Sequence, residues 1–299
     1  MDIIDDQFEP LPMRSVDRFA LAALVWISFF GAQQIVFAQS PATYTPQELR
    51  RHFQNVAESY QMRAGGRLLS LREQPLMHWQ NTVRQQEQGG LYLWEKNGRP
   101  QVLGSIFTYQ LDDQVRCRHE MISVSDTPLT SALHAKTVWS PKLAGVEWTP
   151  VDGVPKPPES APRRMTQMRG IARQFSGTLK IPDQQPSSLT LIPQPLVRYQ
   201  AADAGVIDGA IFSFAVVTDP EIFFLIEAQK SAGGSLGWFF AAARSHYHAS
   251  ELRRQNQIVW EAPMVIEIEN TNWGQAPWAH QPYFGFNPPQ PLPAPEALR

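Results

Sequence analysis

The sequence predicts an α+β fold built from two duplicated units, each with one helix followed by a four- or five-stranded antiparallel meander sheet. Three observations lead to this prediction. A stretch of the chain occurs twice, a helix-like segment precedes each copy, and short strand-like runs separated by turn residues make up the rest of each copy.

The repeated stretch is clearest where residues 69–79 read LSLREQPLMHW and residues 189–199 read LTLIPQPLVRY, 120 positions later (189 − 69 = 120). Aligned without gaps, residues 69–101 and 189–221 are identical at eight of 33 positions. Unrelated sequences of average composition would share about two. Two copies of this length predict two similar domains, or two halves of one pseudo-symmetric domain, and not a solenoid.

A helix is predicted at the start of each copy. Thr45 precedes Pro46 and Glu48 lies in the first turn, which is typical of a capped helix start, and Ser160 with Pro162 predicts the same in the second copy. Apolar residues then recur at spacings of three and four, which predicts one apolar stripe on each helix that needs a sheet to pack on. The stripes are Leu49, Phe53, Val56 and Tyr60, and Met165, Met168, Ile171 and Phe175.

Strand-like runs follow each helix. In the first copy they are LSLREQPLMHW, GGLYLWEK, QVLGSIFTYQ and VRCRHEMISV, with turns at Asn97-Gly98 and Asp112-Asp113. In the second copy they are SLTLIPQPLVRY, GAIFSFAVV, EIFFLIEAQ and GWFFAAARS, with turns at 218–220 and 232–234. One more strand is expected near Val138-Trp139 and near Val259-Trp260.

The domain boundaries follow from composition. Residues 1–38 resemble a Sec-type signal peptide, with Arg14 and Arg18 before an apolar stretch and a cleavage site at 36–38, and translation starting at Met13 is an alternative. An uncleaved membrane anchor is the competing interpretation. The two repeats occupy 39–148 and 163–276, joined by a proline-rich linker at 149–162. The proline-rich tail, 277–299, either wraps one domain or is a partly disordered partner-binding segment.

Composition excludes several functions. A formal net charge of −2, with 18% charged residues, gives no basic footprint for nucleic acid or for an anionic membrane surface. Membrane contact is therefore expected only if the N-terminal segment is uncleaved. Cys117 is the only cysteine, so an intrachain disulfide and a cysteine-rich zinc site are excluded, and this residue is predicted to be a small core residue.

Three motifs in the sequence have patterns that occur in catalytic or metal sites. Gly233 to Gly237 matches G-x-S-x-G, but a strand-like run follows it, which favours a hairpin turn over a serine nucleophile. His246 and His248 have a spacing used by metal sites, yet no third ligand is evident. His119 and Glu120 point to opposite faces of a predicted strand and make a poor acid-base pair. We predict no catalytic residue, no metal site and no cofactor.

Large aromatic residues hold equivalent positions in the two copies, and with one histidine they form the candidate ligand-binding set. The hypothesis is an apolar pocket between helix and sheet, suited to a small ligand. The competing and favoured interpretation is that these side chains fill the core. The residues are Trp79, Trp94, His119, Tyr199 and Phe214.

A resemblance covers most of the chain after the N-terminal segment. VWSPKLAGVEWTPVDGVP, followed by RRMTQMRGIARQF and LIPQPLVRY, is similar to a set of uncharacterised exported proteins of planctomycete type. The resemblance implies export and this domain organisation, and it implies no activity, cofactor or site residue. The order of the predicted elements also resembles cystatin and NTF2-like domains in outline.

The sequence thus predicts an exported protein, periplasmic or extracellular and with the alternative of a membrane anchor, that binds a small ligand or an envelope protein without catalysis. The alternative is a small-molecule hydrolase or isomerase that uses an apolar pocket in one repeat. Enzymes usually gather ionisable residues in a cleft, and the sequence displays no such cluster.

Overall fold

The computed structural model describes residues 44–81, 86–111, 114–230, 233–265, 280–288 and 292–298. The predicted signal peptide, the Asp112-Asp113 turn and part of the predicted tail lie outside these residues. None of the helices in the described part of the chain is long and apolar enough to cross a membrane.

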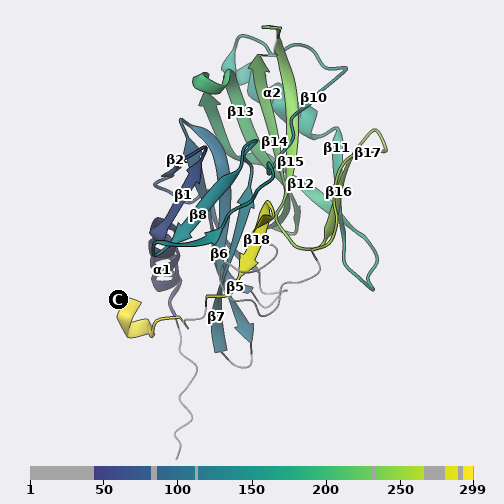
Figure 1. Ribbon diagram of the computed structural model, residues 1–299. Coiled ribbons are helices and arrows are strands. Elements are labelled where there is room, and N and C mark those ends of the chain that lie inside the picture. Colours follow the sequence, from purple (N-terminus) through teal and green to yellow (C-terminus); the bar gives the residue numbers. More distant parts are fainter. Residues whose placement is uncertain are drawn as a thin grey trace, which may run out of the picture. The chain divides into compact units, whose positions relative to one another are not determined.

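Two α-helices are present among the described residues, and each opens one half of the chain (Figure 1). Helix α1 (Pro46–Ser59) begins with the predicted capping box, because Thr45 Oγ1 accepts a hydrogen bond from the Glu48 amide at 3.2 Å and Glu48 Oε2 accepts one from the Thr45 amide at 2.8 Å. Helix α2 (Ala161–Ala172) begins after Ser160, whose side chain makes no capping bond, so that part of the prediction is wrong.

The first half of the chain forms two antiparallel sheets. The smaller has the order β2-β1-β8-β9 and the larger the order β18-β7-β6-β5-β3, with β4 also paired to β5. The strands are β1 (Tyr60–Ala64), β2 (Arg67–Leu68), β3 (Ser70–Leu71), β4 (Met77–Asn81), β5 (Gln86–Lys96), β6 (Arg99–Leu111), β7 (Gln114–Ser123), β8 (Leu129–Leu133) and β9 (Lys136–Trp139), together with the C-terminal β18 (Tyr283–Phe286).

The second half forms one eight-stranded antiparallel sheet with the order β10-β15-β14-β13-β12-β11-β16-β17. A short 3₁₀ turn, η1 (Ala202–Ala204), follows β12, and a second one, η3 (Pro295–Leu298), lies near the C-terminus. The strands are β10 (Thr149–Pro150), β11 (Phe175–Lys180), β12 (Ser187–Ala201), β13 (Val206–Val216), β14 (Asp219–Lys230), β15 (Leu236–Arg244), β16 (Ala249–Arg254) and β17 (Gln257–Ala262).

The predicted fold class is wrong: the protein is mostly β, with three sheets in place of two helix-plus-meander units. Consecutive strands do pair in β5–β6–β7 and in β12–β13–β14–β15. However, the strand after each helix pairs with a hairpin from much later in its half. β1 pairs with β8 in a separate sheet, whereas β11 bridges β12 and β16 and so joins the hairpin to the main sheet.

The wrong fold prediction comes in part from the apolar stripes, which were assigned entirely to the two helices. Tyr60 and Phe175 continue the helical spacing in the sequence, but each is the first residue of a strand. The burial of Tyr60, Met62 and Ala64, with exposed residues between them, is the alternation of a half-buried strand. A spacing of four satisfies both a helical turn and every second position of a strand, so the stripe alone could not separate the two.

Apolar residues gather in three clusters. One lies between α1 and the sheets of the first half, one between α2 and the eight-stranded sheet, and the third between the six-stranded and eight-stranded sheets. Neighbouring residues of β5 serve different clusters: Tyr92 and Trp94 belong to the first, Leu91 and Leu93 to the third. The central strands of the two large sheets are therefore buried on both faces, and the halves of the chain share a core.

Turn chemistry is predicted well at one hairpin. Asn97 and Gly98 have φ values of 50° and 81°, and they connect β5 to β6. Two positive φ values in a two-residue hairpin explain why asparagine and glycine occupy it. The hairpin lies against the end of β12, where a Cβ at Gly98 would be 2.7 Å from the Gln200 carbonyl oxygen.

Both proline-rich segments take part in pairing. In the predicted linker, Thr149 and Pro150 pair with Phe240 and Phe239 of β15, and Val151 is buried in the second cluster. In the predicted tail, β18 pairs with β7 (Figure 1), and Leu292 is buried in the first cluster.

Candidate functional site

The five candidate ligand-binding residues do not meet in one place. Trp94 is packed in the first cluster, Phe214 in the second and Tyr199 in the third. Trp79 packs on Phe107, with ring centroids 5.2 Å apart, and lines a hollow of only about 20 Å³. That volume is close to the space of a single water molecule, so it does not suit an organic ligand.

His119 is buried beside the first cluster. Its Nδ1 lies 2.7 Å from the hydroxyl of Tyr60, and its ring meets that of Phe286 at a centroid distance of 5.1 Å. Burial, with a smaller contribution from the charge of His52, lowers the pKa of His119 to about 3. The imidazole is therefore neutral at physiological pH, and its Nδ1 accepts or donates the hydrogen bond with Tyr60 according to its tautomer.

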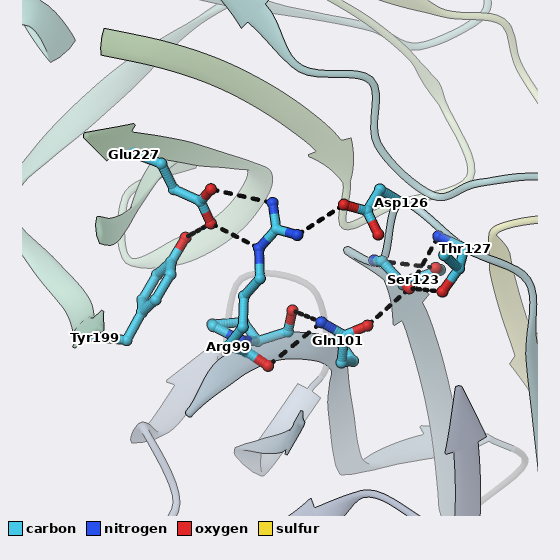
Figure 2. A network of polar contacts seen from close by, with 9 residues as sticks. Arg99, Gln101, Ser123, Asp126, Thr127, Tyr199 and Glu227 are labelled. Atoms are coloured by element: carbon cyan, nitrogen blue, oxygen red, sulfur yellow. Dashed lines mark hydrogen bonds and ion pairs between the residues drawn. The ribbon is translucent and has the colours of Figure 1, made fainter. Parts of the chain in front are cut away.

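A buried polar network contains Tyr199 and joins the two halves of the chain (Figure 2). Arg99 of β6 reaches Glu227 of β14 in a bidentate pair, Nε to Oε1 and Nη2 to Oε2, each at 3.0 Å. The Tyr199 hydroxyl donates to the same Oε1 at 2.8 Å, and Arg99 Nη1 donates to Asp126 at 2.7 Å. The guanidinium also lies 5.1 Å from the centre of the Trp148 ring.

In this network the charges of Arg99 and Glu227 compensate each other. Burial raises the pKa of the Glu227 carboxyl, and the Arg99 charge and the hydrogen bonds from Arg99 and Tyr199 oppose that shift. Burial also raises the pKa of Tyr199, so its hydroxyl stays protonated. Both oxygens of Glu227 are occupied and its side chain is fully buried. The network therefore fixes the two sheets against each other and offers no free carboxylate.

A polar hollow of about 420 Å³ lies on the outer side of Arg99. Its charged lining residues have both signs, and the Asn97 amide donates to Asp203 at 2.7 Å across the two halves. Because the charges nearly cancel, the hollow has no clear preference for an anion or a cation. Its charged residues are Arg67, Lys96, Arg99, Asp126 and Asp203.

A larger cavity of about 660 Å³ lies where the six-stranded and eight-stranded sheets meet. Its walls come from the ends of β7 and β15, from Gly145, from the end of β17 with the residues after it, and from β18 with the residues before it. The lining is largely apolar, which is the usual character of a small-molecule site. The lining side chains include Ile122, Ala243, Trp260, Ala262, Met264, Val265, Pro282 and Tyr283.

One cation lines this cavity. Arg244 is the last residue of β15, it is half-buried, and its Nη2 donates a hydrogen bond to the Pro263 carbonyl. Burial lowers the pKa of this guanidinium. The other titratable lining residues are Glu261, which is exposed, and Tyr283, whose hydroxyl donates to Glu120 at 2.9 Å.

The surroundings of the G-x-S-x-G match and of the histidine pair do not suit catalysis or metal binding. Ser235 immediately precedes strand β15, whereas a nucleophile elbow needs a strand-to-helix turn. His246 and His248 stack on one another with ring centroids 4.6 Å apart. Within the described ranges, no group of three or more histidine, cysteine or acidic side chains is placed to hold a metal ion.

Sequence reasoning missed both the Arg99–Glu227 pair and the cavity. A signal for the pair was present, because Glu227 interrupts the apolar run EIFFLIEAQ, and a carboxylate inside such a run usually has a buried partner. Its partner is 128 positions away in the chain, beyond the reach of a local pattern. The cavity had no comparable signal, since its walls come from five separate segments.

The chain was compared with known protein families, with curated proteins and with solved structures, and none of them matches it.

Proposed function

We propose that this is an exported protein that binds a small, mainly apolar molecule in the cavity of about 660 Å³ between the two large sheets, without catalysing a reaction on it. The size and lining of this cavity carry the proposal, because ligand sites are commonly about 300–1,000 Å³ and lined by apolar and aromatic side chains. Export rests on the signal-like residues 1–38 and on the resemblance of the later segments to exported proteins.

The walls support binding because they are part of the fold. Ile122, Ala243 and Tyr283 belong to the cluster between the two sheets, and Val265 packs against it. The Val265 amide also donates to the Tyr247 carbonyl at 2.8 Å, and the Ser123 amide to the Pro282 carbonyl at 2.8 Å. Walls held in this way are formed before a ligand arrives, so binding costs little ordering of the protein.

The titratable groups support binding over catalysis. General acid-base chemistry needs a side chain that can exchange a proton near neutral pH. Burial raises the pKa of the Tyr283 hydroxyl well above its usual value, and this hydroxyl donates a hydrogen bond to Glu120. Arg244 is a permanent cation at neutral pH. These groups suit recognition of a ligand better than proton transfer.

The test uses N-phenyl-1-naphthylamine, a neutral apolar dye whose fluorescence rises on transfer out of water. The full chain should enhance its fluorescence saturably. Ala262→Phe should weaken binding at least about tenfold, because the new ring occupies the cavity, whereas Ala202→Phe places the same ring on an exposed turn and should leave binding unchanged.

Val265→Trp is a second filling variant, since Val265 is half-exposed and lines the cavity. Urea unfolding of each variant shows that it is folded. If the wild-type chain does not bind the dye, or if both folded filling variants bind it as tightly as the wild type, the proposed function is wrong. A role in contacting an envelope protein would then be the better hypothesis.

A further inference from the structure

Most of the buried and half-buried arginines that the structure describes are matched by a carboxylate, although Arg169 and Arg254 bond to the side-chain oxygens of Gln194 and Gln174. Arg99 pairs with Glu227 and Asp126, and Arg118 pairs with Glu120 at 2.8 Å. Arg164 and Arg198 share the buried carboxylate of Asp208. This pattern is expected, because a guanidinium removed from water needs a compensating negative charge.

Arg244 also lacks a carboxylate partner, and unlike Arg169 and Arg254 it lines the cavity of about 660 Å³. Among the residues that the structure describes, no carboxylate oxygen lies within ion-pair distance of its guanidinium, and its hydrogen bond goes to the neutral Pro263 carbonyl. The pKa of Arg99 and Arg118 is raised by their acidic partners, whereas burial lowers that of Arg244. The Arg244 charge is thus desolvated without being neutralised.

The donors of Arg244 exceed what the protein uses. A guanidinium has five N–H donors in a planar fork that matches the two oxygens of a carboxylate. Nη2 is engaged by Pro263, and the side chain also lines the cavity. Glu261, the acidic lining residue, is exposed and forms no ion pair with Arg244. An anion in the cavity would therefore meet the fork without competition from a carboxylate of the described residues.

We propose that the ligand is an amphipathic carboxylate, whose acid group pairs with Arg244 while its apolar chain lies along Ile122, Ala243 and Ala262. This inference rests on the proposed function, since it names the chemical class that the same cavity accepts. The ligand supplies the negative charge that the protein supplies at Arg99, Arg118 and Arg164.

The test compares decanoate with 1-decanol, which have the same chain length and differ in charge. Each displaces N-phenyl-1-naphthylamine from the full-length protein. In the wild type, decanoate should displace the dye at a concentration at least about tenfold lower than decanol, the ratio that charge-assisted hydrogen bonds give. Arg244→Gln should reduce this ratio to about one, because it removes the charge that distinguishes decanoate from decanol.

Arg163→Gln is the matched control, because it removes an exposed arginine from helix α2 and should leave the decanoate preference intact. Arg244→Lys should retain part of the preference, since it keeps the charge and loses the fork. The inference is overturned if decanoate and decanol displace the dye equally from the wild type, or if Arg244→Gln keeps the preference. In both cases the dye still binds and the proposed function stands, whereas absence of dye binding overturns both.

Discussion

Tyr199 lies opposite Gly209 on the neighbouring strand, and its ring occupies the space that a side chain at Gly209 would need. A Cβ at Gly209 would lie 2.6 Å from the ring, and Trp79 and Gly89 repeat the relationship with a distance of 2.4 Å. Glycine leaves the strand surface open, and an aromatic ring from the cross-strand partner covers it. The two aromatic rings therefore pack on the parts of the sheet surface that the glycines leave open.

Gly209→Ala should destabilise the protein by about 1–3 kcal/mol, because the Tyr199 ring must move within a packed core. Urea unfolding measures the loss. Gly170→Ala is the control, since nothing lies within 4 Å of a Cβ at this position of helix α2, and it should be neutral or stabilising by up to about 1 kcal/mol. In a Tyr199→Ala background the cost of Gly209→Ala should disappear. A cost that persists there would contradict this account.

Glu227→Gln should cost about 3–5 kcal/mol of stability, because it leaves the Arg99 charge buried without its main partner. The glutamine can still accept the Tyr199 hydrogen bond, so the loss reports on the charge pair. Arg72→Gln breaks the more exposed pair with Glu95 and should cost less than about 1 kcal/mol. Denaturant unfolding of the two variants under the same conditions tests this order, and equal losses would contradict it.

The neutral state of His119 predicts a loss of stability in acid. Its pKa is about 3 in the folded protein and about 6.5 in the unfolded chain, so the unfolded state binds the extra proton between these values. Stability therefore rises with pH across this window, by at most about 1.4 kcal/mol for each pH unit. His119→Gln should flatten this part of the profile. If the urea midpoints of the wild type and of His119→Gln fall equally between pH 7 and pH 4, the neutral state assigned to His119 is contradicted.

Cys117 should be unreactive in the folded protein. Its side chain is buried in the first cluster, and burial raises the pKa of the thiol to about 12, so almost none of it is thiolate at neutral pH. Iodoacetamide should label the native chain far more slowly than the chain in denaturing urea, with mass spectrometry as the readout. Similar rates in the two conditions would show that the thiol is exposed.

Deleting residues 283–299 should unfold the first half of the chain or destabilise it by several kcal/mol. The deletion removes Phe284, Phe286 and Leu292 from the first cluster and takes the Tyr283 hydroxyl from Glu120. Deleting residues 293–299 alone should cost much less, because it keeps β18. Circular dichroism and urea unfolding distinguish the two, and a fully stable 1–282 chain would contradict the role given to β18.

The sequence predicts single elements better than their pairing. The Thr45 cap of α1 and the Asn97-Gly98 turn are confirmed, since each depends on residues adjacent in the chain. β5 (Gln86–Lys96) and β13 (Val206–Val216) also have bounds 120 positions apart, as the repeat does, while the internal duplication itself stays a prediction. The prediction of the sheets was wrong because β1 pairs with β8 and β11 pairs with β16. No local pattern in the sequence specifies strand partners so far apart.

A second signal was present and unused. The runs GGLYLWEK and EIFFLIEAQ are almost continuously apolar, which indicates strands buried on both faces, whereas a sheet covered by one helix would alternate. Read in that way, β5 and β14 predict that the two large sheets pack together, as the third cluster shows. The cavity remained out of reach, because its walls are set by that packing and not by any one segment.

The pairing of β18 with β7 fixes the order in which the chain can finish folding. Tyr283 of β18 pairs with Ile122 of β7. β7 therefore cannot complete its pairing until a strand that lies more than half the chain length later has been synthesised. Synthesis proceeds from the N-terminus, and long-range pairing of this kind is slow. The half of the protein that leaves the ribosome first is therefore the half completed last, and its aromatic core stays open until the final residues have emerged.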